Sequence, residues 1–97
     1  MSELIGIVNG SVSMDLIIGR EYEILHGQRN ESNNNKVHFK GVLIQETEWF
    51  YVLKGLNYCK SFLKIDFATK IYKCREVMSN KIIRVRYYTM TGGKVIE

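Results

Sequence analysis

Proline, cysteine and histidine are scarce in this chain, and their scarcity excludes several kinds of site. There is no proline, and there are only two cysteines and two histidines among the 97 residues. Cys59 and Cys74 are too few and too far apart for a structural zinc site, which needs four ligands at short spacings. We expect both cysteines to be reduced and buried. A disulfide between them, or a metal site that adds His26 and His38, is the alternative.

Long apolar segments and catalytic motifs are also missing. No apolar run approaches the roughly 18 residues that cross a membrane. Residues 1–19 lack the basic start and the continuous apolar stretch of a secretory signal. The GxSxG, HExxH and phosphate-cradling glycine motifs are absent, and Asp66 and His38 have no catalytic partner at a readable spacing. We therefore expect a cytoplasmic protein with no membrane partner, no cofactor and no enzymatic activity.

Acidic and basic residues are unevenly divided along the chain. Residues 1–35 contain two Lys or Arg and five Asp or Glu, a balance of −3. Residues 36–97 contain twelve and five, a balance of +7. A basic half of this kind favours an anionic partner such as a nucleotide, a nucleic acid or an acidic protein surface. The alternative is that the lysines keep exposed strands in solution and block edge pairing.

The sequence is rich in short apolar or alternating segments bounded by turn residues, which are typical of β-strands. Five of them follow one another, at residues 19–27, 36–46, 48–55, 58–65 and 70–77. A long asparagine-rich loop, residues 28–35, follows the first, and a short turn, residues 64–69, precedes the last. This order predicts an all-β fold, a small SH3-like barrel with its core in residues 19–76, within a single domain that spans residues 1–97.

Two further elements flank the expected barrel. Asn9-Gly10 lies between two apolar segments, which predicts an N-terminal hairpin within residues 1–18, with a short helix over Met14–Ile18 as the alternative. Residues 81–90 predict an additional C-terminal strand. Inside the barrel the apolar alternation shifts at Gly41, which predicts a β-bulge or a sharp bend there.

The sharpest functional feature is a basic strand near the C-terminus. Arg84 and Arg86 are two residues apart on one face of the predicted strand, about 7 Å from each other. Two guanidinium groups at this spacing suit phosphates, and Tyr88 offers a ring on which a base could stack. Lys81, Lys73 and Arg75 complete the expected ligand-binding set. The structural alternative is that the arginines pair with Glu46, Glu48 or Glu76.

A second candidate surface is aromatic. SH3-like domains bind extended peptides through exposed aromatic side chains, and the candidates here are Tyr22, Trp49, Tyr51 and Tyr58. Neither an Ala-Leu-Tyr opening motif nor a second tryptophan after Trp49 is present, so the groove of eukaryotic peptide-binding SH3 domains is not recognisable. A core position is the preferred interpretation of Trp49.

Four features together resemble small phage and prophage SH3-like proteins: the segment DLIIGREYEI, an apolar strand interrupted by glycine, the segment EWFYVLKG and a Phe-Leu-Lys turn. The resemblance spans residues 15–76. It implies a non-enzymatic accessory factor encoded by a phage or mobile element. Some phage proteins of this size antagonise host antiviral defence by covering a nucleic-acid surface or by sequestering a nucleotide signal.

The basic half and the Arg84/Arg86 pair lead us to expect a binding protein that captures an anionic ligand, a nucleotide or a nucleic acid. One alternative is an inhibitor or scaffold that contacts a host protein through exposed strand edges and aromatic side chains. Another is a structural component that serves only assembly. Strand edges rich in Ile, Val and Tyr also favour a homo-oligomer.

Overall fold

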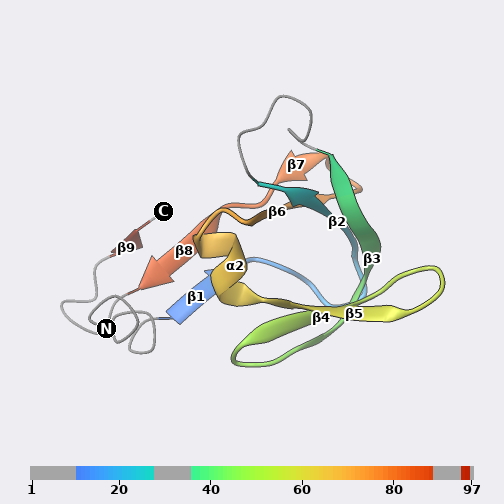
Figure 1. The fold of residues 1–97 in the computed structure, drawn as a ribbon, viewed down its shortest axis with the longest axis horizontal. Coiled ribbons are helices and arrows are strands. Elements are labelled where there is room, and N and C mark those ends of the chain that lie inside the picture. Colours follow the sequence, from blue (N-terminus) through green and yellow to red (C-terminus); the bar gives the residue numbers. More distant parts are fainter. Residues whose placement is uncertain (1–10, 28–35, 89–94, 97) are drawn as a thin grey trace.

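The structure is a computed structural model, and it describes residues 11–27, 36–88 and 95–96 (Figure 1). The elements in chain order are β1 (Ser11–Met14), β2 (Glu21–His26), β3 (Val37–Glu46), β4 (Phe50–Lys54), β5 (Cys59–Leu63), α2 (Lys64–Ala68), β6 (Tyr72–Glu76), β7 (Lys81–Ile82), β8 (Val85–Tyr88) and β9 (Val95–Ile96). The all-β prediction is confirmed. Within the described ranges no helix is long and apolar enough to cross a bilayer.

The five strands predicted between residues 19 and 77 are present in the predicted order. β2, β3, β4 and β5 pair successively as antiparallel neighbours, and β6 returns to pair with β2. With β7 they form a six-stranded sheet in the order β5-β4-β3-β2-β6-β7. In the described part of the chain β5 and β7 are the two edges of this sheet, so no closed barrel is formed.

The register of β3 shifts twice against its neighbours. Ile24 faces Phe39 and the next residue of β2 faces Val37, which leaves His38 as an extra residue on β3. Ile44 is a second extra residue, opposite β4. A bulge of this kind turns the extra side chain away from the regular alternation. It therefore determines where the His38 ring points.

The bulge predicted at Gly41 is wrong, because the alternation of β3 continues through this residue. Phe39 and Leu43 are buried on either side of it, whereas Ile44 is 43% exposed. A Cβ atom at residue 41 would lie 2.7 Å from the carbonyl oxygen of Lys54. Gly41 therefore allows the end of β4 to approach β3 closely.

β1, β8 and β9 form a separate three-stranded sheet in the order β1-β8-β9 (Figure 1). The arm predicted to continue as a strand to Ile18 ends at Met14, and Ile17 and Ile18 are 49% and 61% exposed. The alternative of a helix over this segment is also wrong, since no helix forms there. The rest of the predicted hairpin, with the Asn9-Gly10 turn, lies outside the described residues.

The strand predicted over residues 81–90 is divided between the two sheets. β7 pairs with β6, and the amide of Ile83 still donates to the carbonyl of Cys74 over 2.7 Å. After Arg84 the chain continues as β8 beside β1. Alternation with a period of two is the same in both sheets, so it contains no sign of the change. Residues 89–94 lie outside the described ranges.

The core contains the buried faces of β2 to β6 and the aromatic side chain of α2. Its fully buried side chains are Tyr22, Ile24, Leu25, Leu43, Tyr51, Leu53, Phe67 and Cys74. Burial raises the pKa of the Cys74 thiol to about 12. Cys59 is exposed on the edge strand β5, and both cysteines are free. The expectation of two buried cysteines is therefore wrong for Cys59.

Two buried tyrosines attach the N-terminal segment to the six-stranded sheet. The amide of Met14 donates to the Tyr51 hydroxyl over 3.1 Å, and the amide of Ile17 donates to the Tyr22 hydroxyl over 2.8 Å. Both rings are fully buried, and burial raises the pKa of Tyr51 to about 12. Each hydroxyl thus accepts a hydrogen bond from a backbone N–H group of the N-terminal segment.

Candidate ligand-binding site

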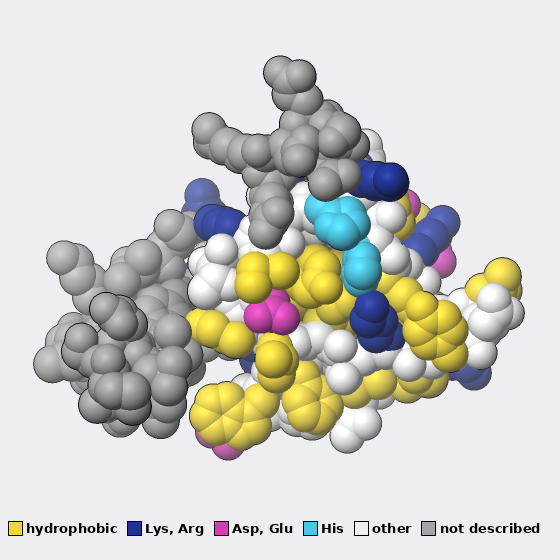
Figure 2. Space-filling model, viewed as in Figure 1, with side chains coloured by type: hydrophobic (Ala, Val, Ile, Leu, Met, Phe, Trp, Pro, Cys, Tyr) yellow, Lys and Arg dark blue, Asp and Glu magenta, His cyan; other side chains and the backbone are white. Residues whose placement is uncertain are grey.

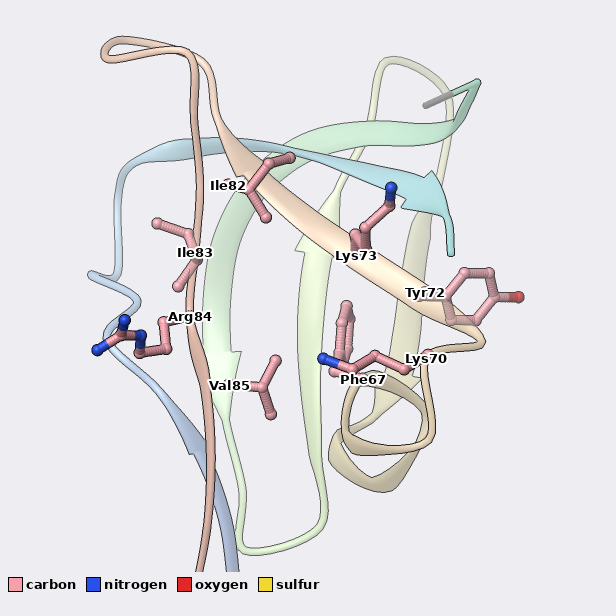
Figure 3. Close-up of a pocket in the computed structure, with 8 residues that line it drawn as sticks. All are labelled: Phe67, Lys70, Tyr72, Lys73, Ile82, Ile83, Arg84 and Val85. Carbon is pink, nitrogen blue, oxygen red and sulfur yellow. The ribbon is translucent and has the colours of Figure 1, made fainter. Parts of the chain in front are cut away.

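A pocket lies where α2, β6 and the segment from β7 to β8 meet (Figure 3). Its cavity volume is about 320 Å³, close to the lower end of the range for small-molecule sites, roughly 300–1,000 Å³. The lining divides into apolar side chains, cations and one tyrosine: Phe67, Ile82, Ile83 and Val85; Lys70, Lys73 and Arg84; and Tyr72.

The floor of the pocket is apolar and continuous with the core. Phe67 is 1% exposed, and Ile83 and Val85 are half-buried side chains packed against the core. Figure 3 shows Val85 directed toward Phe67 across the cavity. A floor of this kind excludes water from one side of a bound planar group.

A sharp turn after α2 brings Lys70 to the pocket. The amides of Thr69 and Ile71 donate to carbonyls within α2, at 2.9 Å each, and these bonds close the helix. Lys70 adopts a left-handed conformation with a φ of 68°, which ends a helix and reverses the chain. The end of β2 approaches this turn so closely that a Cβ atom at Gly27 would lie 2.3 Å from the Lys70 carbonyl oxygen. Glycine is thus needed at residue 27.

Positive charge dominates the polar part of the pocket. Lys70, Lys73 and Arg84 supply the charged groups, and no Asp or Glu is among the lining residues. In Figure 3 the ammonium group of Lys70 extends across the cavity toward Val85, whereas the guanidinium group of Arg84 is turned outward. Within the described ranges the Lys70 ammonium makes no hydrogen bond or ion pair.

The structure brings two of the six predicted ligand-binding residues into this pocket, Lys73 and Arg84. Lys81 is exposed on β7 and does not line the cavity. The side chain of Tyr88 lies outside the part of the structure that is described, although its backbone pairs with β1 and β9.

The other two predicted residues, Arg75 and Arg86, are held in ion pairs. Arg75 Nη2 lies 2.8 Å from Glu23 Oε1, directly across the β2–β6 ladder. Arg86 Nη2 contacts Asp15 Oδ1, and the buried Nε of Arg86 has no hydrogen-bond partner. For Arg86, the predicted alternative of an ion pair with Glu46, Glu48 or Glu76 is therefore wrong. Among the described residues Glu46 pairs with Lys64, and Glu76 pairs with Arg20.

The other six lining residues were absent from the predicted ligand-binding set, among them Phe67, Lys70 and Tyr72. Phe67 lies in the segment predicted as a plain turn, which the structure shows as α2. A large apolar residue three positions after Lys64 is the one signal in the sequence that favours a buried helical turn there.

The aromatic candidates separate into two buried and two exposed residues. Tyr22 and Tyr51 are 0% exposed, so the prediction that they contact a partner is wrong. Trp49 and Tyr58 are 55% and 60% exposed, so a core position for Trp49 is also wrong. Trp49 precedes β4 and Tyr58 precedes β5, at opposite ends of the β4–β5 ladder. These two side chains therefore do not form one continuous groove.

The chain matches no protein-family model, no curated protein and no solved structure. Any conclusion about function therefore rests on the chemistry of the pocket and of the surfaces around it.

Proposed function

We propose that the protein is a non-catalytic binding protein that captures a nucleotide or a nucleic acid in the pocket between α2, β6 and the segment from β7 to β8. One observation carries the proposal: an apolar floor that contains Phe67 has cations at its rim and no carboxylate in its lining. A base is planar and apolar on its faces, and a phosphate is anionic. The pocket offers one surface suited to each.

The charge distribution around the pocket supports an anionic ligand. The nearby carboxylates of Glu23 and Glu76 are engaged with Arg75 and Arg20, at 2.8 and 3.0 Å. Hydrogen bonds from Ser79 and Arg20 hold the pKa of Glu76 below its ordinary value. These carboxylates are therefore neutralised by their own partners, and Lys70 is left to attract a ligand.

The fold supplies the scaffold for this site. We infer that the six-stranded sheet is an open relative of SH3-like barrels, because β6 returns from the end of the meander to pair with β2. That return brings Lys73 beside the turn that contains Lys70. The resemblance to phage and prophage proteins suggests a setting in which sequestering a nucleotide signal, or covering a nucleic-acid surface, antagonises host defence.

Substitution of Lys70 tests the proposal most directly. Binding of thymidine, adenine and guanine nucleotides and of a thymidine oligonucleotide is measured by calorimetry for the wild type, Lys70→Ala and Lys54→Ala. Lys54 is exposed on β4, does not line the pocket, and loses the same charge. We expect Lys70→Ala to weaken binding about 10-fold, as for the loss of one charge-assisted hydrogen bond. Lys54→Ala should change it less than about 2-fold.

The salt dependence separates the possible results further. Affinity should fall as the salt concentration rises, because the ligand's phosphates are contacted by cations. Equal losses for both lysine variants would show that net charge alone attracts the ligand and that the pocket has no role. Absence of binding to every probe would refute the proposal, and native mass spectrometry of protein purified from bacterial cells would then report whether another small ligand is retained.

A second candidate function is protein binding through the edge strand β5. Within the described residues β5 pairs only with β4, and exposed apolar side chains surround this edge, among them Leu56 at 98% exposure and Leu63 at 49%. An unpaired edge with apolar neighbours can add a strand from another chain, including a second copy of this one. Binding of this kind would tolerate salt and would be lost in Trp49→Ala or Tyr58→Ala.

A further inference from the structure

Both histidines of the chain lie together in a cluster outside the pocket. The ring centroids of His26 and His38 are 5.0 Å apart in an edge-to-face arrangement. Lys60 Nζ lies 2.9 Å from His38 Nε2. The cluster draws His26 from β2, His38 from β3 and Lys60 from β5, and we call it the histidine–lysine cluster. Figure 2 shows the two histidine side chains side by side on the surface, with a cationic side chain next to them.

The position of His38 depends on the bulge in β3. His38 is the extra residue opposite β2, and the bulge turns its ring toward His26 and Tyr72. The ring centroids of His38 and Tyr72 are 5.1 Å apart. Among the described residues, the ring and hydrogen-bond contacts of His38 are with aromatic rings and a cation: His26 from β2, Lys60 and Phe62 from β5, and Tyr72 from β6.

Within the described ranges no carboxylate balances this charge. Among the described residues neither the two histidines nor Lys60 forms an ion pair with Asp or Glu. Partial burial, followed by the positive charges of Lys60 and His26, holds the pKa of His38 below its ordinary value. At neutral pH His38 is thus uncharged. Its Nε2 accepts a hydrogen bond from the Lys60 ammonium, because an ammonium group can only donate.

Tyr72 connects this cluster to the pocket. It lines the cavity, its ring centroid is 6.1 Å from that of Phe67, and it contacts His38 on the other side. Figure 3 shows its hydroxyl directed away from the centre of the pocket. Two cationic groups, the ammonium groups of Lys70 and Lys60, therefore lie on either side of one half-buried aromatic side chain.

We propose that the histidine–lysine cluster is a second phosphate subsite, and that the ligand is a short single-stranded nucleic acid that passes over Tyr72 from one subsite to the other. This inference rests on the proposed function, because it assigns a substrate class to the same surface. A backbone phosphate at the cluster accepts hydrogen bonds from Lys60 and from the ring N–H groups of both histidines. A mononucleotide occupies the pocket alone.

Binding at the cluster takes up a proton. When a phosphodiester arrives, Lys60 turns to its oxygens, and His38 Nε2 changes from acceptor to donor by binding a proton from solvent. A phosphodiester keeps its single negative charge throughout the physiological range, so the proton is taken up by the protein. The anion raises the pKa of His38, and affinity must therefore increase as the pH falls through the histidine range.

The test uses nuclear magnetic resonance to compare the binding of thymidine 5′-monophosphate with that of a thymidine tetranucleotide. Because the chain has only two histidines, the histidine ring signals report on the cluster alone. The signals of Val85 and Phe67 report on the pocket. We expect the monophosphate to shift the pocket signals only, and the tetranucleotide to shift both sets and to bind about 10-fold more tightly. Its affinity should rise several-fold between about pH 8 and about pH 5.5.

Two variants and a matched control complete the test. Lys60→Met should lower the tetranucleotide affinity about 10-fold and leave monophosphate binding unchanged. Lys40→Met, an exposed lysine on β3, should change neither. His38→Phe preserves a ring against Tyr72 and Phe62 and should weaken the pH dependence. A well-dispersed spectrum of each variant verifies that it is folded.

The outcomes separate the two proposals. If the tetranucleotide shifts the pocket signals but neither histidine, or binds no more tightly than the monophosphate, the second subsite is refuted and the proposed function stands. If it shifts the histidines but not the pocket, the cluster binds phosphate and the pocket assignment fails. If neither ligand shifts any signal, the second subsite is refuted, and the binding of adenine and guanine nucleotides then decides the proposed function.

Discussion

The two sheets of this protein are assembled in opposite ways. Most neighbours in the six-stranded sheet are neighbours in the sequence, since β2 to β5 pair in succession. The three-stranded sheet joins β1 to β8, which lie at opposite ends of the described chain. The first sheet carries most of the buried core that the structure describes, whereas Met14 is the one buried residue among those of the second sheet whose burial is described. Stability should thus be concentrated in the six-stranded sheet, and the other should open separately at a lower free energy.

The largest expected effect comes from Tyr51→Ala, which removes a fully buried ring from the six-stranded sheet. We expect it to lower the free energy of unfolding by about 3–5 kcal/mol. Val12→Ala removes a half-buried side chain from β1 and should lower it by less than about 1 kcal/mol. Urea unfolding followed by the fluorescence of Trp49, the single tryptophan, measures both. Equal losses would contradict the division between the sheets.

A smaller effect is expected from Tyr51→Phe, which keeps the ring and removes the hydroxyl that accepts from the Met14 amide. The buried amide of Met14 then has no hydrogen-bond acceptor, which should lower the free energy of unfolding by about 1–3 kcal/mol. Hydrogen exchange at Met14 should accelerate about 10-fold or more, while exchange in β3 stays slow. Tyr58→Phe alters an exposed hydroxyl and is the control. An unchanged Met14 amide would show that β1 is attached by other contacts.

These hydroxyl contacts mark the limit of what the sequence predicts. The strands of the six-stranded sheet were predictable, because alternation and turn residues are local signals. The pairing of β1 with β8 was not predictable, since nothing in the segment SVSM indicates which strand it pairs with. The site follows the same division: Lys73 and Arg84 were predicted from the charge pattern. Phe67 and Lys70 enter the pocket only through α2 and the left-handed turn after it.

The prediction for Arg86 also depended on a contact between residues that are distant in the sequence. Alternation placed Arg84 and Arg86 on one face, and the sequence contained no sign of a distant partner. In the structure Arg86 lies opposite Ser13 in the β1–β8 ladder and contacts Asp15. The long-range pairing of β1 with β8 therefore determines which carboxylate Arg86 contacts, and only the folded chain shows it.

The Arg86–Asp15 pair should contribute little, because the Asp15 side chain is 84% exposed. We expect Asp15→Asn to change the free energy of unfolding by less than about 1 kcal/mol, and by less still in high salt. Arg86→Met keeps the apolar part of the side chain and removes the buried Nε that has no partner, so it should be close to neutral. A double-mutant cycle with both substitutions measures the pair, and a coupling well above 1 kcal/mol would contradict this estimate.

The smallest expected effect is a pH dependence confined to the six-stranded sheet, which contains both histidines. The pKa of His38 is lowered in the folded state, mainly by burial and then by Lys60. At a pH below the ordinary pKa of histidine, this residue binds a proton more readily in the unfolded chain than in the folded chain. The free energy of unfolding therefore falls as the pH falls through this range. Urea unfolding across this range should show the trend in the wild type, and His38→Phe should flatten it. An equally steep trend in the variant would exclude His38 as its cause.

The pairing of β1 with β8 also bears on how the chain folds during synthesis. β1 leaves the ribosome before any other described strand, but its partner follows only after β2 to β7 have been made. At about 5–20 residues per second this interval lasts several seconds. The six-stranded sheet can form in that time, because its hairpins are complete earlier. Until then β1 has no partner among the described strands, and this nascent chain is the state most exposed to chaperones, proteases and wrong partners.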